Sequence, residues 1–260
     1  MPRYRVRRPP EPGSTRGALA VSDSLVAGWD ALPRLELKPR HLIRHRVITA
    51  ECRNPSAGTI DLLRTRVLNA MEQRGWRHLG ITAPTWGCGV TFIAANLGMS
   101  FARQKHLRTL LLDTNLRDPG LASVLGARNP GPLLPALEEK EPLETRIRRV
   151  SDSFAVILND TAVDSSAEVL KSSVTDRVLT RAFDALKPDV VLYDLAPVLA
   201  HDDVLSLRHR LDAVLLVIRG GRSTSPEVRE LEGLLEGEIP ILATVLNEAE
   251  DGRAARRDRR

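Results

Sequence analysis

A glycine-containing loop between an apolar run and a small-residue helical pattern restricts the fold of this chain more than any other feature. The loop, residues 82–91, reads Thr-Ala-Pro-Thr-Trp-Gly-Cys-Gly-Val-Thr; the apolar run 78–81 precedes it, and helical spacing over residues 92–104 follows it. In such a strand–loop–helix unit, backbone N–H groups and a helix N-terminus form a site for phosphate. The sequence therefore predicts that this loop binds a phosphorylated ligand.

Apolar runs alternate with helical patterns along most of the chain. A helical pattern over residues 60–75 precedes the loop, and helical stretches separate six short apolar runs. Several runs are continuously apolar, as in strands that helices cover on both faces. The sequence thus predicts an α/β fold with a mostly parallel central sheet flanked by helices on both faces. The runs are residues 79–83, 109–113, 154–158, 190–194, 213–218 and 241–246.

Charge separates an acidic centre from two basic ends. Residues 1–50 contain ten Lys or Arg against four Asp or Glu, and residues 251–260 contain five against two, so the centre is net negative although the chain carries +5. An acidic centre argues against specific nucleic-acid binding. We predict a disordered basic arm over residues 1–53, a folded domain over 54–249 and a basic tail over 250–260. The basic ends leave open a peripheral contact with an anionic membrane.

Two aspartates stand at the ends of apolar runs. Asp113 ends the run 109–113, and Asp194 ends the run 190–194. The carboxyl ends of parallel strands face the crevice where open α/β sheets bind their ligands. Beside a phosphate loop, two carboxylates and the Thr91 hydroxyl can hold Mg²⁺. An isolated aspartate would more simply end a strand or cap a helix, but the three pieces in this order favour a nucleotide site.

Taken together, these motifs resemble the cytoplasmic domain of the bacterial tyrosine kinases. That family of P-loop NTPases is related to the Min/Par-type ATPases and regulates capsule and exopolysaccharide synthesis. The resemblance covers residues 54–248 and would make this region a P-loop kinase-like domain. The matching segments are residues 61–66, 83–89, 94–97, 112–117, 119–121, 125–126, 167–173, 194–199, 202–203 and 245–247.

The resemblance implies ATP or ADP and Mg²⁺ as ligands, with a role for each matching residue. Asp113 would activate the attacking hydroxyl and help to hold Mg²⁺. Thr91 and Asp194 would complete the metal shell, and Asn247 would lie near the base. The loop residues assigned to nucleotide binding are Thr85, Trp86, Gly87, Cys88, Gly89, Val90 and Thr91.

Departures from the family pattern predict phosphoryl transfer that is weak or lost. Val90 stands where the family has a lysine, whose charge stabilises the phosphates electrostatically. Arg117 is the candidate substitute cation. Asn115 replaces the second aspartate of its motif, and the tyrosine-rich tail of the family's kinases is missing, leaving Tyr4 and Tyr193 as the tyrosines of the chain.

Three functions stay open on the sequence. We favour a cytoplasmic kinase-like regulatory protein of exopolysaccharide biosynthesis or export that binds ATP or ADP weakly, with impaired phosphoryl transfer. By the resemblance, an inner-membrane polysaccharide copolymerase or export protein would be its partner and would recruit it to the inner face of the plasma membrane; a homo-oligomer stays open. The alternatives are an active protein-tyrosine kinase or ATPase with a substitute cation, and a Min/Par-type positioning ATPase.

Overall fold

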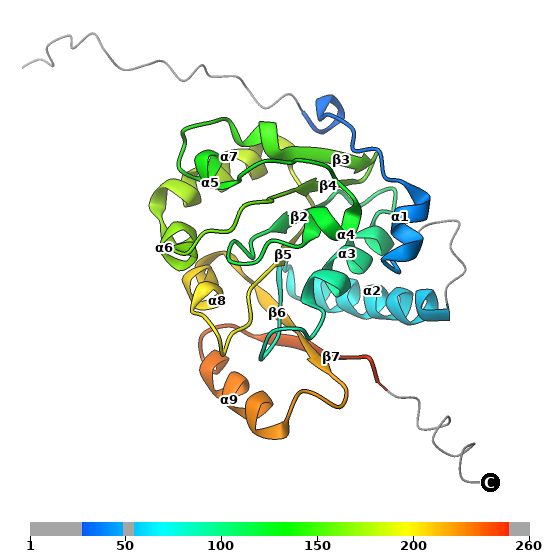
Figure 1. Ribbon diagram of the computed structural model, residues 1–260, viewed down its shortest axis with the longest axis vertical. Coiled ribbons are helices and arrows are strands. Elements are labelled where there is room, and N and C mark those ends of the chain that lie inside the picture. The colour runs from blue at the N-terminus through cyan, green and yellow to red at the C-terminus, as the bar shows by residue number, and fades with distance from the viewer. Residues whose placement is uncertain (1–27, 49–54, 250–260) are drawn as a thin grey trace, which may run out of the picture.

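A seven-stranded sheet forms the centre of the computed structural model, which describes residues 28–48 and 55–249 (Figure 1). The strand order is β3-β4-β2-β5-β1-β6-β7. Neighbouring strands are parallel except for β3, which is antiparallel to β4. The predicted mostly parallel sheet is confirmed, and every predicted apolar run forms a strand. The strands are β1 His78–Thr82, β2 Thr109–Asp113, β3 Ile147–Ser151, β4 Phe154–Ile157, β5 Val190–Asp194, β6 Ala213–Arg219 and β7 Ile241–Asn247.

Helices cover both faces of this sheet. On one face lie α2 (Pro55–Arg74), α3 (Val90–Phe101) and α4 (Leu121–Leu125), with α1 (Pro39–Arg44) beside α4. The other face carries α5 (Leu134–Leu137), α6 (Ser166–Lys171), α7 (Ser173–Leu186), α8 (Asp203–Ser206) and α9 (Ser225–Leu235). The 3-10 helices of the described residues are η1 (Trp29–Ala31), η2 (Leu143–Arg146) and η3 (Arg208–Arg210). None of the described helices combines the length and the apolar character needed to cross a membrane.

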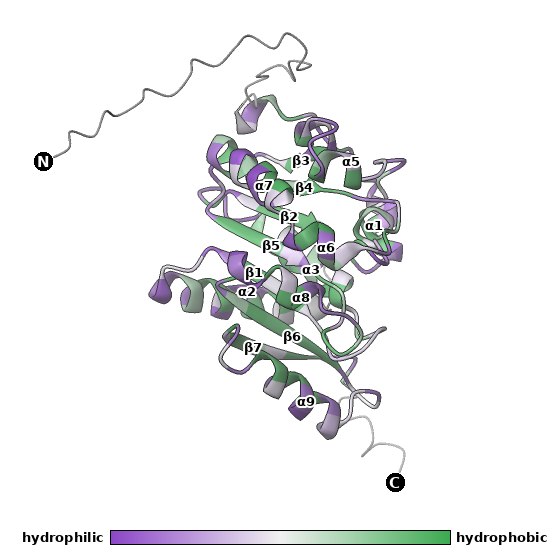
Figure 2. Cartoon of the chain, turned by 90° about the vertical axis from the view of Figure 1, so that its left-hand side faces the viewer, coloured by the Kyte–Doolittle hydropathy of each residue, from purple (hydrophilic) through white to green (hydrophobic). Residues whose placement is uncertain are grey.

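The central strands contribute side chains to two separate apolar layers. Leu111 of β2 packs in the layer beneath α2 and α3, whereas its neighbours Leu110 and Leu112 pack on the opposite side. Tyr193 and Leu192 of β5 divide in the same way. Hydrophobic strands therefore run between helices with hydrophilic outer faces (Figure 2). Burial on both faces explains why these runs are continuously apolar in the sequence.

Residues 28–48 belong to the folded domain. Trp29 and Leu42 are 2% and 3% exposed, and the Ile48 amide donates a hydrogen bond of 2.8 Å to the buried Asn96 side chain. The prediction of a disordered arm over residues 1–53 is therefore wrong for residues 28–48. The charge and proline content of this segment favoured a prediction of disorder, although a few widely spaced apolar residues in it are buried in the core. The rest of that range, and the predicted tail 250–260, lie outside the described residues.

The segment 33–35 covers the edge of the sheet at β3. The Leu35 amide donates to the Arg149 carbonyl at 2.9 Å, and the Arg149 amide donates to the Pro33 carbonyl at 2.8 Å. These bonds satisfy backbone groups that an edge strand otherwise leaves exposed. Sequence analysis missed β3 itself, because its residues Ile-Arg-Arg-Val-Ser lack a continuous apolar run.

Candidate functional site: a phosphate loop and a buried carboxylate pair

The glycine loop connects β1 to α3 at the carboxyl end of the sheet. Because β1 lies between β5 and β6, the loop starts near the middle of the sheet. Gly87 and Gly89 have φ of +80° and +92°, which L side chains rarely adopt. A Cβ on Gly89 would also collide with the side-chain amide of Asn247. The loop therefore adopts the left-handed backbone conformation at the two positions where the sequence has glycine.

The helix α3 begins directly after this turn. Gly89 is its N-cap, and the first helical bond runs from the Ile93 amide to the Gly89 carbonyl at 3.0 Å. The amides at the start of a helix have no acceptor within the helix, and the helix dipole adds partial positive charge there. Val90 and Thr91 occupy this first turn, so their N–H groups are available to an anion.

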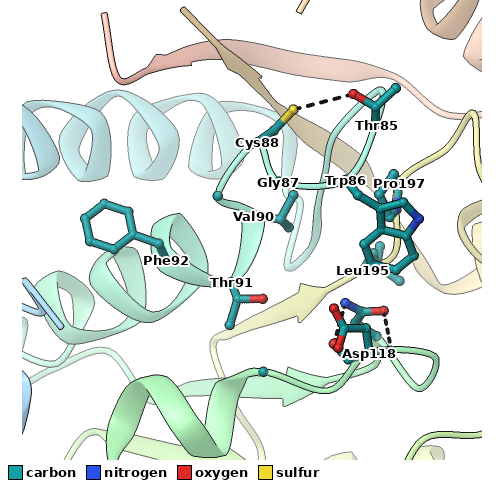
Figure 3. A pocket seen from close by; sticks show the side chains of 13 residues that line it. Thr85, Trp86, Gly87, Cys88, Val90, Thr91, Phe92, Asp118, Leu195 and Pro197 are labelled. Atoms are coloured by element: carbon teal, nitrogen blue, oxygen red, sulfur yellow. Dashed lines mark hydrogen bonds between the residues drawn. The ribbon is translucent and has the colours of Figure 1, made fainter. Parts of the chain in front are cut away.

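A pocket of about 190 Å³ lies between the loop and the turn that follows β2 (Figure 3). The Thr91 hydroxyl points into it, and the Trp86 ring stands beside Pro197 at its edge. Trp86 is 36% exposed and meets the His201 ring edge-on, with 5.8 Å between ring centroids. The residues that line the pocket are Thr85, Trp86, Gly87, Cys88, Gly89, Val90, Thr91, Phe92, Asn115, Asp118, Gly120, Leu195 and Pro197.

The pocket lining carries negative charge without a cation. Asp118 is its charged side chain, and within the described parts of the chain no Lys or Arg lines it. Val90 occupies the position at which the sequence resemblance expects a lysine. Backbone dipoles and the N-terminus of α3 are thus the positive groups of the pocket itself.

Two buried carboxylates lie beneath the pocket. Asp113 and Asp194 face each other in register at the ends of β2 and β5, and both are 0% exposed. The Leu121 amide donates to Asp113 Oδ2 at 3.1 Å. The other three carboxylate oxygens, Oδ1 of Asp113 and both oxygens of Asp194, have no hydrogen-bond partner among the described residues. Buried polar atoms normally find partners, so this pair calls for a ligand.

Burial is the largest cause of the pKa shifts of this pair. It raises the pKa of Asp113 well above its usual range, and the neighbouring Asp194 charge raises it further, while the Leu121 amide acts in the opposite direction. Burial raises the pKa of Asp194 to about 7; the nearby Thr91 hydroxyl lowers it, and the Asp118 charge raises it. A bound cation would reverse these shifts, because it favours the ionised forms.

The side chains around this pair fit Mg²⁺. Two carboxylates and the Thr91 hydroxyl supply oxygen ligands, which Mg²⁺ prefers, and it usually keeps waters or phosphate oxygens as its remaining ligands. No cluster of three or more His, Cys, Asp or Glu with the geometry of a metal site occurs within residues 28–48 and 55–249. A phosphate-assisted magnesium site therefore suits this chain better than a cage built from protein side chains.

Arg117 is held by a buried partner. Its Nε donates to Asp203 Oδ2 at 2.8 Å, and its Nη1 donates to the Asp164 carbonyl at 2.8 Å. The Asp203 side chain is fully buried, so removing this ion pair would leave an uncompensated charge. Arg117 is also absent from the pocket lining. These contacts weigh against Arg117 as the substitute cation.

Asn247 and Asn115 stabilise backbone turns around the pocket. The Asn247 amide donates to the Cys88 carbonyl at 2.9 Å and so fastens the loop to the end of β7. The Asn115 amide donates to the Asp118 carbonyl at 2.8 Å and closes the turn after β2. Cys88 is buried, with its sulfur 3.5 Å from the Ser223 hydroxyl, as expected of a small residue that fills the loop.

Sequence analysis gave no role to several residues that shape this site. Asp118 lines the pocket, Asp203 holds Arg117, and Arg219 donates from Nη1 to the Gly87 carbonyl at 3.0 Å. Arg219 is the last residue of β6, and the carboxyl ends of parallel strands meet at one edge of the sheet. Its position after an apolar run was therefore a usable signal.

Comparison with known proteins identifies the relatives of this chain. The EpsB protein of Ralstonia solanacearum is 32% identical over 199 residues, which are 75% of this chain and 26% of EpsB. This chain is related to the bacterial tyrosine kinases. The tyrosine-protein kinase YwqD of Bacillus subtilis is 25% identical over 206 residues, 78% of this chain and 86% of YwqD. The chain thus spans about a quarter of the length of EpsB but most of YwqD. No family model matches the chain.

Solved structures agree with this relationship. The VpsO kinase domain superposes with a TM-score of 0.66 at 26% identity, covering 75% of this chain and 96% of that domain. The septum site-determining protein MinD of Pyrococcus horikoshii, solved with Mg-ADP, gives a TM-score of 0.54 at 19% identity over 70% of this chain and 76% of MinD. The MinD likeness concerns the fold alone. The predicted P-loop NTPase fold and kinase resemblance are both confirmed.

Proposed function

We propose that this chain is a kinase-like regulatory protein of exopolysaccharide biosynthesis or export, which binds ATP or ADP with Mg²⁺ weakly and transfers phosphoryl groups poorly. One observation carries the proposal: the glycine loop lines a pocket beside an unsatisfied, buried carboxylate pair, and no Lys or Arg of the described residues lines that pocket. The relationship to tyrosine kinases supports the kinase-like part.

Each part of the site has a separable role in this proposal. The amides of the loop and of the first turn of α3 would hold the phosphates, while Thr91, Asp113 and Asp194 would hold Mg²⁺. When bound, Mg²⁺ would supply the positive charge that phosphoryl transfer needs. Once its charge is balanced, Asp113 could accept a proton from an attacking hydroxyl. Without a lysine at position 90, phosphate charge that builds up during transfer meets less stabilisation.

The tyrosine of the described residues is a poor acceptor for phosphate. Tyr193 is fully buried, and its hydroxyl lies 2.8 Å from Nδ1 of His78. Burial also raises its pKa far above the usual value. Tyr4, the other tyrosine of the chain, lies outside the described residues. This arrangement supports regulation through nucleotide binding in preference to phosphorylation within residues 28–249.

Calorimetric titration with Mg-ATP and Mg-ADP tests the nucleotide part of the proposal. We expect weak binding that disappears when EDTA removes Mg²⁺, with hydrolysis close to background. Asp113→Asn should weaken the Mg²⁺-dependent binding, and Asp184→Asn, an exposed change on α7, should not. Absence of binding to either nucleotide, in a protein whose thermal melt shows that it is folded, would contradict the proposal.

We further propose a cytoplasmic location and recruitment to the inner membrane by a polysaccharide copolymerase or export protein. The relationship to tyrosine kinases supports this kind of partner, since the resembling family regulates polysaccharide synthesis. Affinity purification of the tagged chain from solubilised membranes, followed by mass spectrometry, tests it. We expect such a protein to co-purify, and its absence from repeated purifications with and without Mg-ADP would contradict this part.

A further inference from the structure

A turn that carries two arginines lies against the phosphate loop. The turn follows β6 and consists of residues 219–223, Arg-Gly-Gly-Arg-Ser. The Ser223 amide donates to the Arg219 carbonyl at 2.9 Å, and the Arg219 amide donates to the Ser223 hydroxyl at 3.0 Å. These reciprocal bonds close the turn. The Ser223 hydroxyl also lies next to the Cys88 sulfur, so the turn and the loop are in direct contact.

Both guanidinium groups are placed at Gly87. Arg219 donates to the Gly87 carbonyl, and it also forms an ion pair with Glu248. Arg222 Nη1 lies 2.9 Å from the position that a Cβ on Gly87 would take, and its Cζ lies 3.3 Å from that position. Gly87 lines the phosphate pocket. The absence of a side chain at Gly87 therefore allows a guanidinium to approach the loop backbone closely.

The two arginines differ in how their charges are compensated. The Arg219 guanidinium is paired with Glu248, whereas the Arg222 guanidinium has no hydrogen-bond or ion-pair partner within the described residues. Arg222 is exposed and lines a hollow of about 560 Å³ beside the loop, together with Arg219, Gly220, Gly221 and Glu248. A guanidinium is weakly hydrated and can bind a phosphate through two parallel hydrogen bonds. Arg222 thus combines an uncommitted charge, a suitable geometry and a place at the loop.

We infer that Arg222 replaces the missing lysine and binds the phosphates of a nucleotide from the β6 side of the loop. This inference rests on the proposed nucleotide binding. It also accounts for a pocket that lacks a cation, because the compensating charge comes from a neighbouring turn. Arg219 acts as a positioning residue, since its bond to the Gly87 carbonyl keeps the turn and the loop together.

Calorimetry on a double-mutant cycle tests the inference, with Mg-ADP, Mg-ATP and AMP as probes. Arg222→Ala should weaken Mg-ADP and Mg-ATP binding by about 10-fold to 100-fold, the usual range for a lost charged hydrogen bond. AMP should lose less, because it carries fewer phosphate charges. The matched control Arg229→Ala, on the exposed surface of α9, should leave all three affinities unchanged. Thermal melts should show that every variant is folded.

The Val90→Lys background separates phosphate binding by Arg222 from a merely structural role. If Arg222 replaces the lysine, then Arg222→Ala should cost less than about 3-fold once Lys occupies position 90, because the two cations serve the same phosphates. An equal loss in both backgrounds would instead indicate that Arg222 supports the loop or contacts the base, and would overturn the inference.

The remaining outcomes distinguish this inference from the proposed function. Equal Mg-ADP affinity of Arg222→Ala and the unmodified protein would overturn the inference and leave the proposed function intact. Binding by Val90→Lys alone, with none by the unmodified protein, would show that Arg222 does not replace the lysine. If neither protein binds a nucleotide, the proposed function and the inference both fail.

Discussion

The phosphate loop and the carboxylate pair beside the pocket differ in their cost to the stability of the folded protein. The carboxylate side keeps Asp113 and Asp194 fully buried, with three oxygens lacking partners, which is unfavourable without a cation. The loop side has Val90, whose apolar side chain places no such demand on the fold. An unfavourable arrangement that remains in a chain is stronger evidence for a ligand than a missing charge is against one. The side chains present thus fit the proposed Mg²⁺ better than they fit the proposed phosphoryl transfer.

The largest effect should come from restoring a cation on the loop side. We expect Val90→Lys to raise ATP hydrolysis by about 100-fold to 1,000-fold, which is the loss in rate when one preorganised group that stabilises transition-state charge is removed from an enzyme. Release of phosphate under saturating Mg-ATP measures it, with Val90→Leu as the apolar control. No gain over an unmodified protein that already hydrolyses ATP would indicate that the site does not need the lysine.

The next largest effect should be the change in the free energy of unfolding when a buried carboxylate is replaced. The pKa of Asp194 rises from 3.8 to about 7 on folding, so the folded protein retains a proton that the unfolded chain has lost. The stability from this group is therefore present below pH 4 and is lost as pH rises through 7. Without Mg²⁺, Asp194→Asn should be more stable than the unmodified protein by up to about 4 kcal/mol at pH 8, since each pKa unit corresponds to about 1.4 kcal/mol.

Chemical denaturation at pH 4 and pH 8 measures this difference, which should nearly vanish at the lower pH. Saturating Mg²⁺ should reduce it at pH 8, because the cation stabilises the ionised pair. The exposed Asp184→Asn variant should show no comparable pH dependence. Destabilisation of Asp194→Asn at pH 8 in the absence of Mg²⁺ would mean that the carboxylate is satisfied within the fold.

A smaller effect is expected from the shape of the loop. Gly89→Ala should destabilise the protein by about 1–3 kcal/mol, because φ is +92° and the new Cβ would displace the Asn247 amide. Gly233→Ala, at a helical glycine with open space around it, is the control and should be neutral or stabilising. Equal melting temperatures of Gly89→Ala and the unmodified protein would show that the loop relaxes freely.

The smallest effect should follow from releasing the loop from β7. Asn247→Ala removes the hydrogen bond to the Cys88 carbonyl and should cost about 1 kcal/mol of stability. Hydrogen exchange should show faster exchange of amides in residues 85–91 while the central strands stay protected. Unchanged exchange in that segment would show that Arg219 alone is sufficient to hold the loop.

The sequence predicted features that depend on local pattern and missed those that depend on distant contacts. Strands buried on both faces, the glycine turn and the carboxylates at strand ends each have a signature in neighbouring residues. The commitment of Arg117 to Asp203 and the approach of Arg222 to Gly87 join residues 86 and 135 positions apart. No spacing rule connects such pairs. The prediction of disorder was wrong for residues 28–48 because the segment is rich in proline and charge. Its few apolar side chains are far apart in the sequence, and they become buried only when the chain is folded.

The covering of one sheet edge has a consequence for assembly. The backbone bonds from residues 33–35 occupy β3, whereas β7, at the opposite edge, exposes Ile241 and Leu246 at 36% and 54%. Among the described residues, no segment pairs with the outer edge of β7 in the way that residues 33–35 pair with Arg149 of β3. Since Asn247 ends β7 and holds the Cys88 carbonyl, an added strand would border the residue that anchors the loop. The fold thus places the β7 edge within one side chain's length of the phosphate loop.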